Sequence, residues 1–111
     1  MVTTGLIVRL TAKPGKADEL EAFLRGALPL VQDEPDTIAW FAVAIGGASY
    51  AIVDAFPNEQ GRQAHLDGPV AAALFAQAEQ LLEIQPEIEY INVLAAKLPD
   101  GNHDPAEPSS A

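Results

Sequence analysis

The sequence contains no cysteine, which excludes disulfide bonds, thiolate metal sites and a cysteine nucleophile. It has no apolar run that approaches the length of a membrane-spanning helix. Its first ten residues, MVTTGLIVRL, lack the basic region that precedes the apolar core of a signal peptide. We therefore expect a cytoplasmic protein that does not associate with a membrane.

Basic residues are scarce. Six Lys and Arg stand against 16 Asp and Glu, so the formal net charge is −10 and the isoelectric point is about 4.3. A polyanion would be repelled, and no basic stripe appears locally, so DNA and RNA are not expected as partners. The two histidines, His65 and His103, are too far apart for metal-ligand spacing, and no glycine motif for phosphate binding is present. We expect no metal and no cofactor.

A chain of 111 residues is long enough for one domain. Strands are predicted where β-branched and aliphatic residues gather, and helices where apolar residues recur every three or four positions. The predicted order is a strand at 5–12, a helix at 17–31, strands at 37–45 and 50–56, helices at 58–66 and 69–83, and a strand at 88–98. Pro29 should kink the first helix or end it early. Residues 99–111 have the composition of a disordered acidic tail beyond a domain formed by residues 1–98.

This order predicts an α+β, ferredoxin-like βαββαβ fold with an antiparallel four-stranded sheet. The helices of such a fold cover one face of the sheet only. All four predicted strands are apolar on both faces, so the apolar side chains of the second face must be buried by something other than the helices. We expect a second copy of the chain to bury them, giving a homodimer in which the sheet face carrying Trp40 packs against its symmetry mate.

The loop at 46–49 decides which side chains of the two middle strands share a face. If the loop holds an even number of residues, one face carries Phe41, Val43, Ile45, Tyr50, Ile52, Asp54 and Phe56. The other face then carries Trp40, Ala42, Ala44, Ala51, Val53 and Ala55. An odd loop or a β-bulge would reverse this pairing for one of the strands.

The stretch from Tyr50 to Pro69 holds the best candidates for chemistry. Asp54 lies on an otherwise apolar strand face and needs a partner, which could be His65, Arg9 or Arg62. His65, on the following helix, could act as a base or hydrogen-bond donor toward a phenolic substrate. Both residues could equally form a structural pair.

Three segments carry a resemblance to a known family, namely GLIVRLTAKPGKADEL, the acidic DEPDT loop and DAFPNEQGRQAHL. Over roughly residues 5–98 the chain resembles the antibiotic biosynthesis monooxygenase superfamily, whose members are dimeric α+β barrels. The resemblance places His65 where many members have a histidine and Asp54 where many have a glutamate. Phe56 stands where they usually have a tryptophan. Haem-degrading members rely on that tryptophan and on an asparagine in the first strand, both absent here, so haem degradation is not expected.

The resemblance implies a cofactor-independent monooxygenase acting on a phenolic, anthrone or quinol-type aromatic small molecule. His65 would be the base or orienting group and Asp54 would support it. The substrate-binding residues would be Tyr50, Phe56, Phe41 and Arg62. The alternative is a non-catalytic small-molecule-binding or interaction dimer of the same fold.

Overall fold

A computed structural model describes residues 1–99. The elements follow the predicted order: β1 (Thr4–Thr11), α1 (Ala17–Gln32), β2 (Ala39–Gly46), β3 (Ser49–Phe56), α2 (Glu59–Leu66), α3 (Pro69–Leu81) and β4 (Glu87–Asn92). β4 was predicted to reach residue 98 but ends at Asn92. The predicted disordered tail lies, from residue 100 onward, outside the described residues. Within residues 1–99, no helix is long and apolar enough to cross a membrane.

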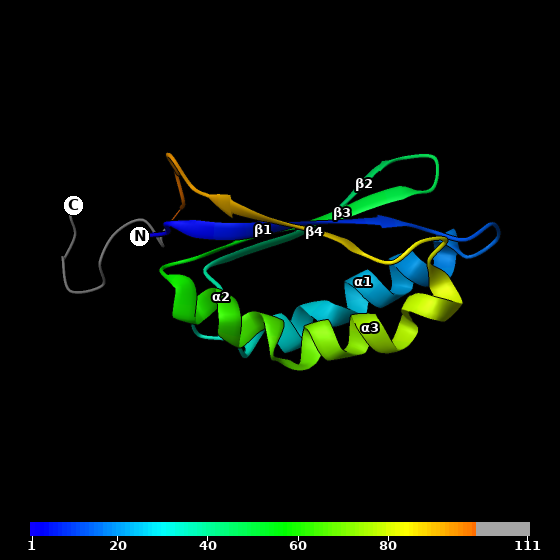
Figure 1. The fold of residues 1–111 in the computed structure, drawn as a ribbon, viewed down its shortest axis with the longest axis horizontal. Coiled ribbons are helices and arrows are strands. Elements are labelled where there is room, and N and C mark those ends of the chain that lie inside the picture. Colours follow the sequence, from blue (N-terminus) through cyan, green and yellow to red (C-terminus); the bar gives the residue numbers. More distant parts are fainter. Residues whose placement is uncertain (100–111) are drawn as a thin grey trace.

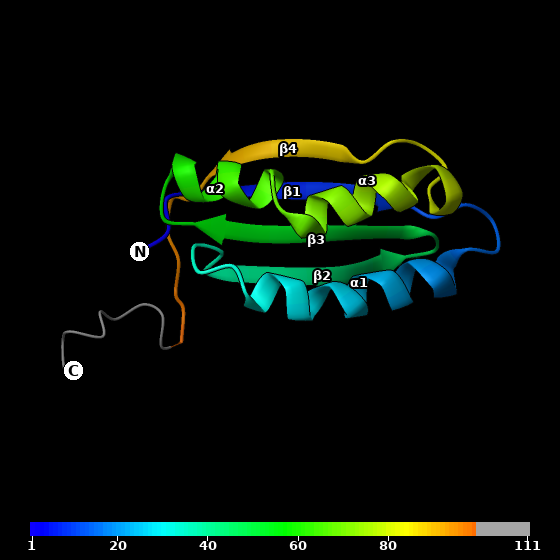
Figure 2. The same cartoon turned by 90° about the horizontal axis from the view of Figure 1, so that it is seen from below.

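The four strands form one antiparallel sheet in the order β2-β3-β1-β4. This arrangement confirms the predicted ferredoxin-like α+β fold. All three helices lie on the same face of the sheet, as Figure 1 shows. Figure 2 looks through the helices onto the sheet, with α1 alongside the edge strand β2 and with α2 and α3 over β1 and β3. The opposite face of the sheet is left open.

Local signals in the sequence set the helix boundaries. The Asn58 side chain accepts a hydrogen bond of 2.9 Å from the Gly61 amide and so caps α2. Gly68 and Pro69 end α2 and begin α3, with proline in the first turn where its missing N–H costs nothing. Pro29 does not end α1 early, because the helix continues to Gln32.

The core lies between the helices and the covered sheet face. Apolar side chains of α1 and α3 pack there against alternate residues of β1 and β3. The largest side chains that are almost completely buried are Leu6, Leu10, Leu20 and Phe56. This layer fixes the positions of β3 and α2, the elements that carry Asp54 and His65.

The predicted register of β2 is wrong. Trp40 pairs with Asp54, Ala42 with Ile52 and Ala44 with Tyr50. A β-bulge between Ala44 and Gly46 leaves Ile45 without a partner. The extra residue reverses the alternation of β2 relative to β3 between Ala39 and Ala44. The covered face therefore carries Trp40 together with Asp54, and the open face carries Phe41.

This correction also changes the expected dimer surface. The open face shows a group of exposed apolar side chains on β2 and β3, namely Phe41, Val43, Ile45 and Val53. Arg9 and Glu89, which lie 3.5 Å apart, make the β1 and β4 side of this face polar. We call the four exposed side chains the open-face patch. Trp40 is not among them.

Candidate functional site

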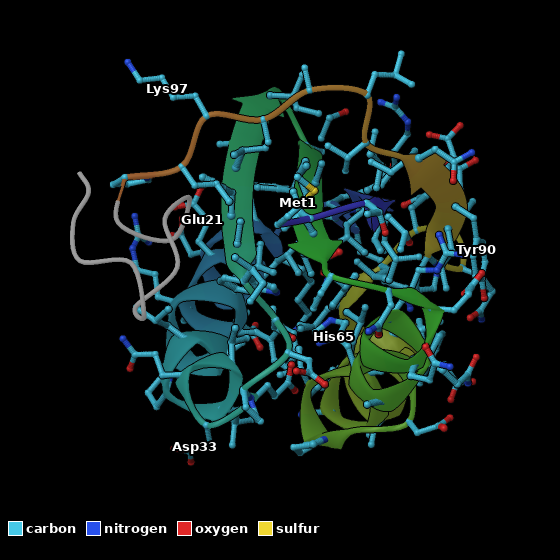
Figure 3. All side chains as sticks on the ribbon, turned by 90° about the vertical axis from the view of Figure 1, so that its left-hand side faces the viewer. Met1, Glu21, Asp33, His65, Tyr90 and Lys97 are labelled. Carbon is cyan, nitrogen blue, oxygen red and sulfur yellow. The ribbon has the colours of Figure 1, made fainter. Side chains whose placement is uncertain are left out.

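Three polar side chains meet under α2, on the covered face of the sheet. The Nε2 atom of His65 lies 3.2 Å from Oδ2 of Asp54, and its Nδ1 atom lies 2.6 Å from Oε1 of Glu34. The Asp54 side chain is completely buried, and the His65 and Glu34 side chains are nearly so. Figure 3 shows His65 in the interior, between α2 and the sheet. We call Asp54, His65 and Glu34 the acid–histidine cluster.

The two carboxylates favour the protonated form of the imidazole. Burial by itself would lower the pKa of His65, but the contacts with Asp54 and Glu34 outweigh burial and raise it above its usual value. The cluster then combines one positive charge with two carboxylates.

The cluster is incompletely hydrogen-bonded. Both carboxylate oxygens of Asp54 and Oε2 of Glu34 are buried without a hydrogen-bond partner among the described residues. The His65–Asp54 contact is thus an ion pair at short distance that lacks the alignment of a good hydrogen bond. Trp40 is paired with Asp54 on the neighbouring strand, and its Nε1 is likewise buried without a partner among the described residues. Buried polar atoms of this kind are uncommon and call for a structural or functional reason.

Sequence reasoning missed Glu34. It comes from the acidic loop before β2, and the Thr37 hydroxyl donates a 2.7 Å hydrogen bond to the same Oε1 atom that contacts His65. The loop contains three acidic residues within QDEPD, and nothing in their spacing distinguishes the one that turns inward. Only the fold brings this loop against α2.

Two of the predicted substrate-binding residues, Phe56 and Arg62, make contacts inside the protein that hold the site together. The Phe56 ring is buried, and its centroid lies 5.4 Å from that of His65. Arg62 donates from Nη1 to the backbone oxygens of Gly5 at 3.1 Å and Ile91 at 3.3 Å, and its guanidinium lies 4.7 Å from the centre of the Tyr90 ring. Arg62 thus ties α2 to β1 and β4.

The other two predicted substrate-binding residues, Phe41 and Tyr50, lie on opposite faces of the sheet. Phe41 is on the open face, with 52% of its surface exposed, and so lies on the opposite side of the sheet from Asp54. Tyr50 is on the covered face, where it lines a groove between α1 and the β2–β3 hairpin.

This groove has a volume of about 380 Å³. Its apolar walls are formed by Leu24 and Leu28 of α1 and by Trp40 and Ala42 of β2. Pockets that hold small organic molecules start at about 300 Å³ and are mostly apolar with a few polar groups. The groove therefore has the size and lining of a small-molecule site, which the sequence did not reveal.

One end of the groove is polar. The Tyr50 hydroxyl donates a 2.7 Å hydrogen bond to Oε2 of Glu21, and Arg25 lies 3.4 Å from the other oxygen of the same carboxylate. The hydrogen bond from Tyr50 lowers the pKa of Glu21, and the same bond raises the pKa of Tyr50. At neutral pH Tyr50 is therefore a neutral hydroxyl and Glu21 a carboxylate.

The acid–histidine cluster does not line this groove. His65 instead touches a separate apolar space of about 30 Å³, lined by residues such as Val8, Ile52 and Leu74. That space has room for about one or two water molecules and is too small for an aromatic ring. Across the residues from 1 to 99, no group of three or more acidic or histidine side chains is arranged to hold a metal ion.

One solved structure decides the family. The crystal structure of NE2512, a protein of unknown function from Nitrosomonas europaea, is 51% identical to the chain, with a TM-score of 0.89, and the match covers 91% of this chain and 98% of that one. The chain belongs to the family of NE2512. No protein-family model matches the sequence, and no curated protein matches it.

More distant structures share the fold. A "putative antibiotic biosynthesis monooxygenase" from Caulobacter crescentus is 18% identical, with a TM-score of 0.74 and coverage of 85% of this chain and 92% of that one. A second protein of that name, from Nitrosomonas europaea, is 13% identical, with a TM-score of 0.73 and coverage of 83% and 90%. The fold expected from the family resemblance is confirmed by these neighbours.

Proposed function

We propose that the groove between α1 and the β2–β3 hairpin binds a small phenolic, anthrone or quinol-type aromatic, which the protein oxidises with dioxygen and without a cofactor. The observation that carries this proposal is the groove itself. Its volume of about 380 Å³ suits two or three fused rings, and Trp40 and Tyr50 offer aromatic surfaces against which such rings pack. The similarity of the fold to proteins named as monooxygenases supports it further.

The chemistry can proceed from the substrate and oxygen alone. Loss of a proton from an anthrone leaves an electron-rich carbanion, which passes one electron to dioxygen and then combines with the superoxide formed. The new carbon–oxygen bond gives a hydroperoxide. Loss of water from that hydroperoxide leaves the ketone, so one oxygen atom enters the product and the other leaves as water. A quinol instead gives two electrons and two protons to dioxygen, which yields a quinone and hydrogen peroxide.

The protein must supply a proton acceptor. Glu21 lies in the groove but is a weak one, because the hydrogen bond from Tyr50 lowers its pKa. The acid–histidine cluster is the other candidate, because the carboxylate oxygens of Asp54 have no aligned hydrogen-bond donor among the described residues. In this proposal Asp54 accepts the proton, and its 3.2 Å contact with His65 positions the carboxylate. The contacts with Asp54 and Glu34 raise the pKa of His65, which favours its protonated form.

Oxygen uptake tests the proposal. Purified protein is incubated with a panel of anthrones and hydroquinones in an oxygen electrode, and the uptake without protein is subtracted. Ala42→Phe fills the groove and should abolish both binding and uptake. Ala76→Phe makes the same substitution at an exposed site on α3 and should change neither. Binding without uptake would leave the non-catalytic alternative, and the absence of binding would overturn the proposal.

We also propose that a second copy of the chain covers the open-face patch and makes a homodimer. The patch is apolar and free of the carboxylates that give the chain its charge, so two copies can meet there without strong repulsion. Phe41 is the largest side chain in the patch, so Phe41→Glu should separate the copies. Light scattering that gives a monomer mass for the wild-type protein at micromolar concentration would contradict the dimer.

A further inference from the structure

We infer that the Trp40 side chain blocks a path from the groove to Asp54. When it moves aside, a neutral hydroxyl of the ligand reaches the Asp54 carboxylate. This inference rests on the proposed function, because it takes the groove as the place where the aromatic ligand binds. It adds a specificity-determining residue, Trp40, and it defines which part of the ligand is recognised.

The register of the sheet places the two residues side by side. Trp40 and Asp54 are directly opposite one another on β2 and β3, with both side chains on the covered face. Directly opposed residues of an antiparallel pair have their Cβ atoms about 4.5–5.5 Å apart. Trp40 forms a wall of the groove, whereas Asp54 does not line it. Trp40 thus borders the groove and is also the neighbour of Asp54 in the sheet, and in this inference its indole separates the two.

The unpaired atoms define the missing group. Nε1 of Trp40 is a donor without an acceptor among the described residues, and the Asp54 oxygens are acceptors without an aligned donor among them. A hydroxyl satisfies both, because it accepts from the indole N–H and donates to the carboxylate. An ether can only accept. A carboxylate or phosphate would in addition be repelled by Asp54 and Glu34.

The contacts of Trp40 are consistent with a movable side chain. Its indole N–H makes no hydrogen bond within the described chain, so turning the ring breaks none. The ring is only partly buried and packs against both apolar clusters of the core. Asp54 and His65, in contrast, are fixed by their mutual contact and by Glu34. In this inference, movement of the Trp40 side chain joins the groove to the cluster.

A matched pair of ligands tests the inference by NMR. The probes are 4-propylphenol and 4-propylanisole, which differ only in that the hydroxyl of the first is a methyl ether in the second. Trp40 is the only tryptophan, so one indole N–H resonance reports on the gate. The His65 imidazole resonances report on the cluster, and a His103→Gln variant assigns them. Dissociation constants come from the same titrations.

The phenol should bind about tenfold more tightly than the ether, because a hydrogen bond to a charged group is among the stronger ones in proteins. The phenol alone should shift both the indole N–H and the His65 resonances. Asp54→Asn should reduce the phenol's advantage to a few-fold while leaving the affinity for the ether unchanged. Trp40→Phe, which keeps an aromatic wall but has no N–H, should also reduce the advantage.

Three results would overturn the inference. If both probes bind equally and His65 does not respond, the groove ends at Trp40, and the proposed binding site stands without the gate. If the phenol's advantage is lost in Tyr50→Phe and kept in Asp54→Asn, the hydroxyl is recognised at Glu21 instead. If neither probe binds, the proposed function fails and the inference fails with it. Binding with the expected preference but without oxygen uptake supports the gate and removes only the catalytic proposal.

Discussion

Asp54→Asn should weaken the fold by an amount that depends on pH. The substitution removes one of the two carboxylates that contact His65 and leaves Glu34 at 2.6 Å from Nδ1. Removing the only partner of a buried charge costs about 3–5 kcal/mol. Because His65 keeps Glu34 as a partner, we expect a smaller loss, about 1–3 kcal/mol, the usual cost of leaving a buried polar group such as the His65 Nε2–H without a partner. In a domain of this size each kcal/mol lowers Tm by about 4–8 °C.

The pH dependence has a definite sign. The folded-state pKa of His65 is raised above its ordinary value of 6.5, so protonated His65 stabilises the fold. That stabilisation is fully present below about pH 6.5 and is lost as pH rises through the folded-state pKa. Asp54→Asn removes part of the cause of the raised pKa. The variant should therefore lose least stability relative to wild type at alkaline pH, where His65 is neutral in both proteins.

Denaturant unfolding followed by Trp40 fluorescence between pH 5.5 and 9 measures the stability, and an NMR titration of His65 measures its pKa. Asp67→Asn is the matched control, because it removes the same charge two residues from His65, at an exposed site bonded only to Gln63 among the described residues. An unchanged His65 pKa in Asp54→Asn, together with a stability loss that does not vary with pH, would refute the reasoning.

Three further predictions concern single contacts. Gly5→Ala should destabilise the protein by about 1–3 kcal/mol in a denaturant melt, because the added Cβ would come within 2.3 Å of the Asp54 backbone oxygen. Asn58→Ala should cost about 1 kcal/mol through loss of the α2 cap, and Asn58→Asp should restore most of it; equal melts for all three proteins would contradict the cap. Tyr50→Phe should raise the pKa of Glu21 toward its ordinary value in a carboxyl NMR titration, and an unmoved pKa would show that the Tyr50–Glu21 hydrogen bond is not formed.

The sequence predicts the order of elements well, because the helix signals are local. Asn58, Gly68 and Pro69 each act on the few residues beside them, and the structure begins and ends α2 and α3 close to the expected positions. The contact between Asp54 and His65 was also predictable. The alternation of β3 places Asp54 with Ile52 on the covered face, and a helix that directly follows the strand has to return over that face.

The register of β2 could not be predicted, because the residues on its two faces are equally apolar. Trp40 and Phe41 are adjacent aromatics, and the alanines and valine that follow place apolar groups on both faces. Only the bulge at Ile45 decides between the two faces, and it depends on how β2 and β3 fit together. Glu34 and the groove were missed for a related reason, since both depend on the placement of α1 and its following loop relative to the sheet.

The attachment of α2 has a consequence for how the protein opens. An eight-residue helix is too short to be stable alone, so α2 persists because of its contacts with other elements. Arg62 ties it to the backbones of β1 and β4, and one turn later His65 ties it to β3 and to the loop carrying Glu34. Local unfolding of α2 would have to break all of these contacts together. Its amide protons should therefore exchange with solvent nearly as slowly as those of the central strands, so that α2 and the sheet behave as one cooperative unit.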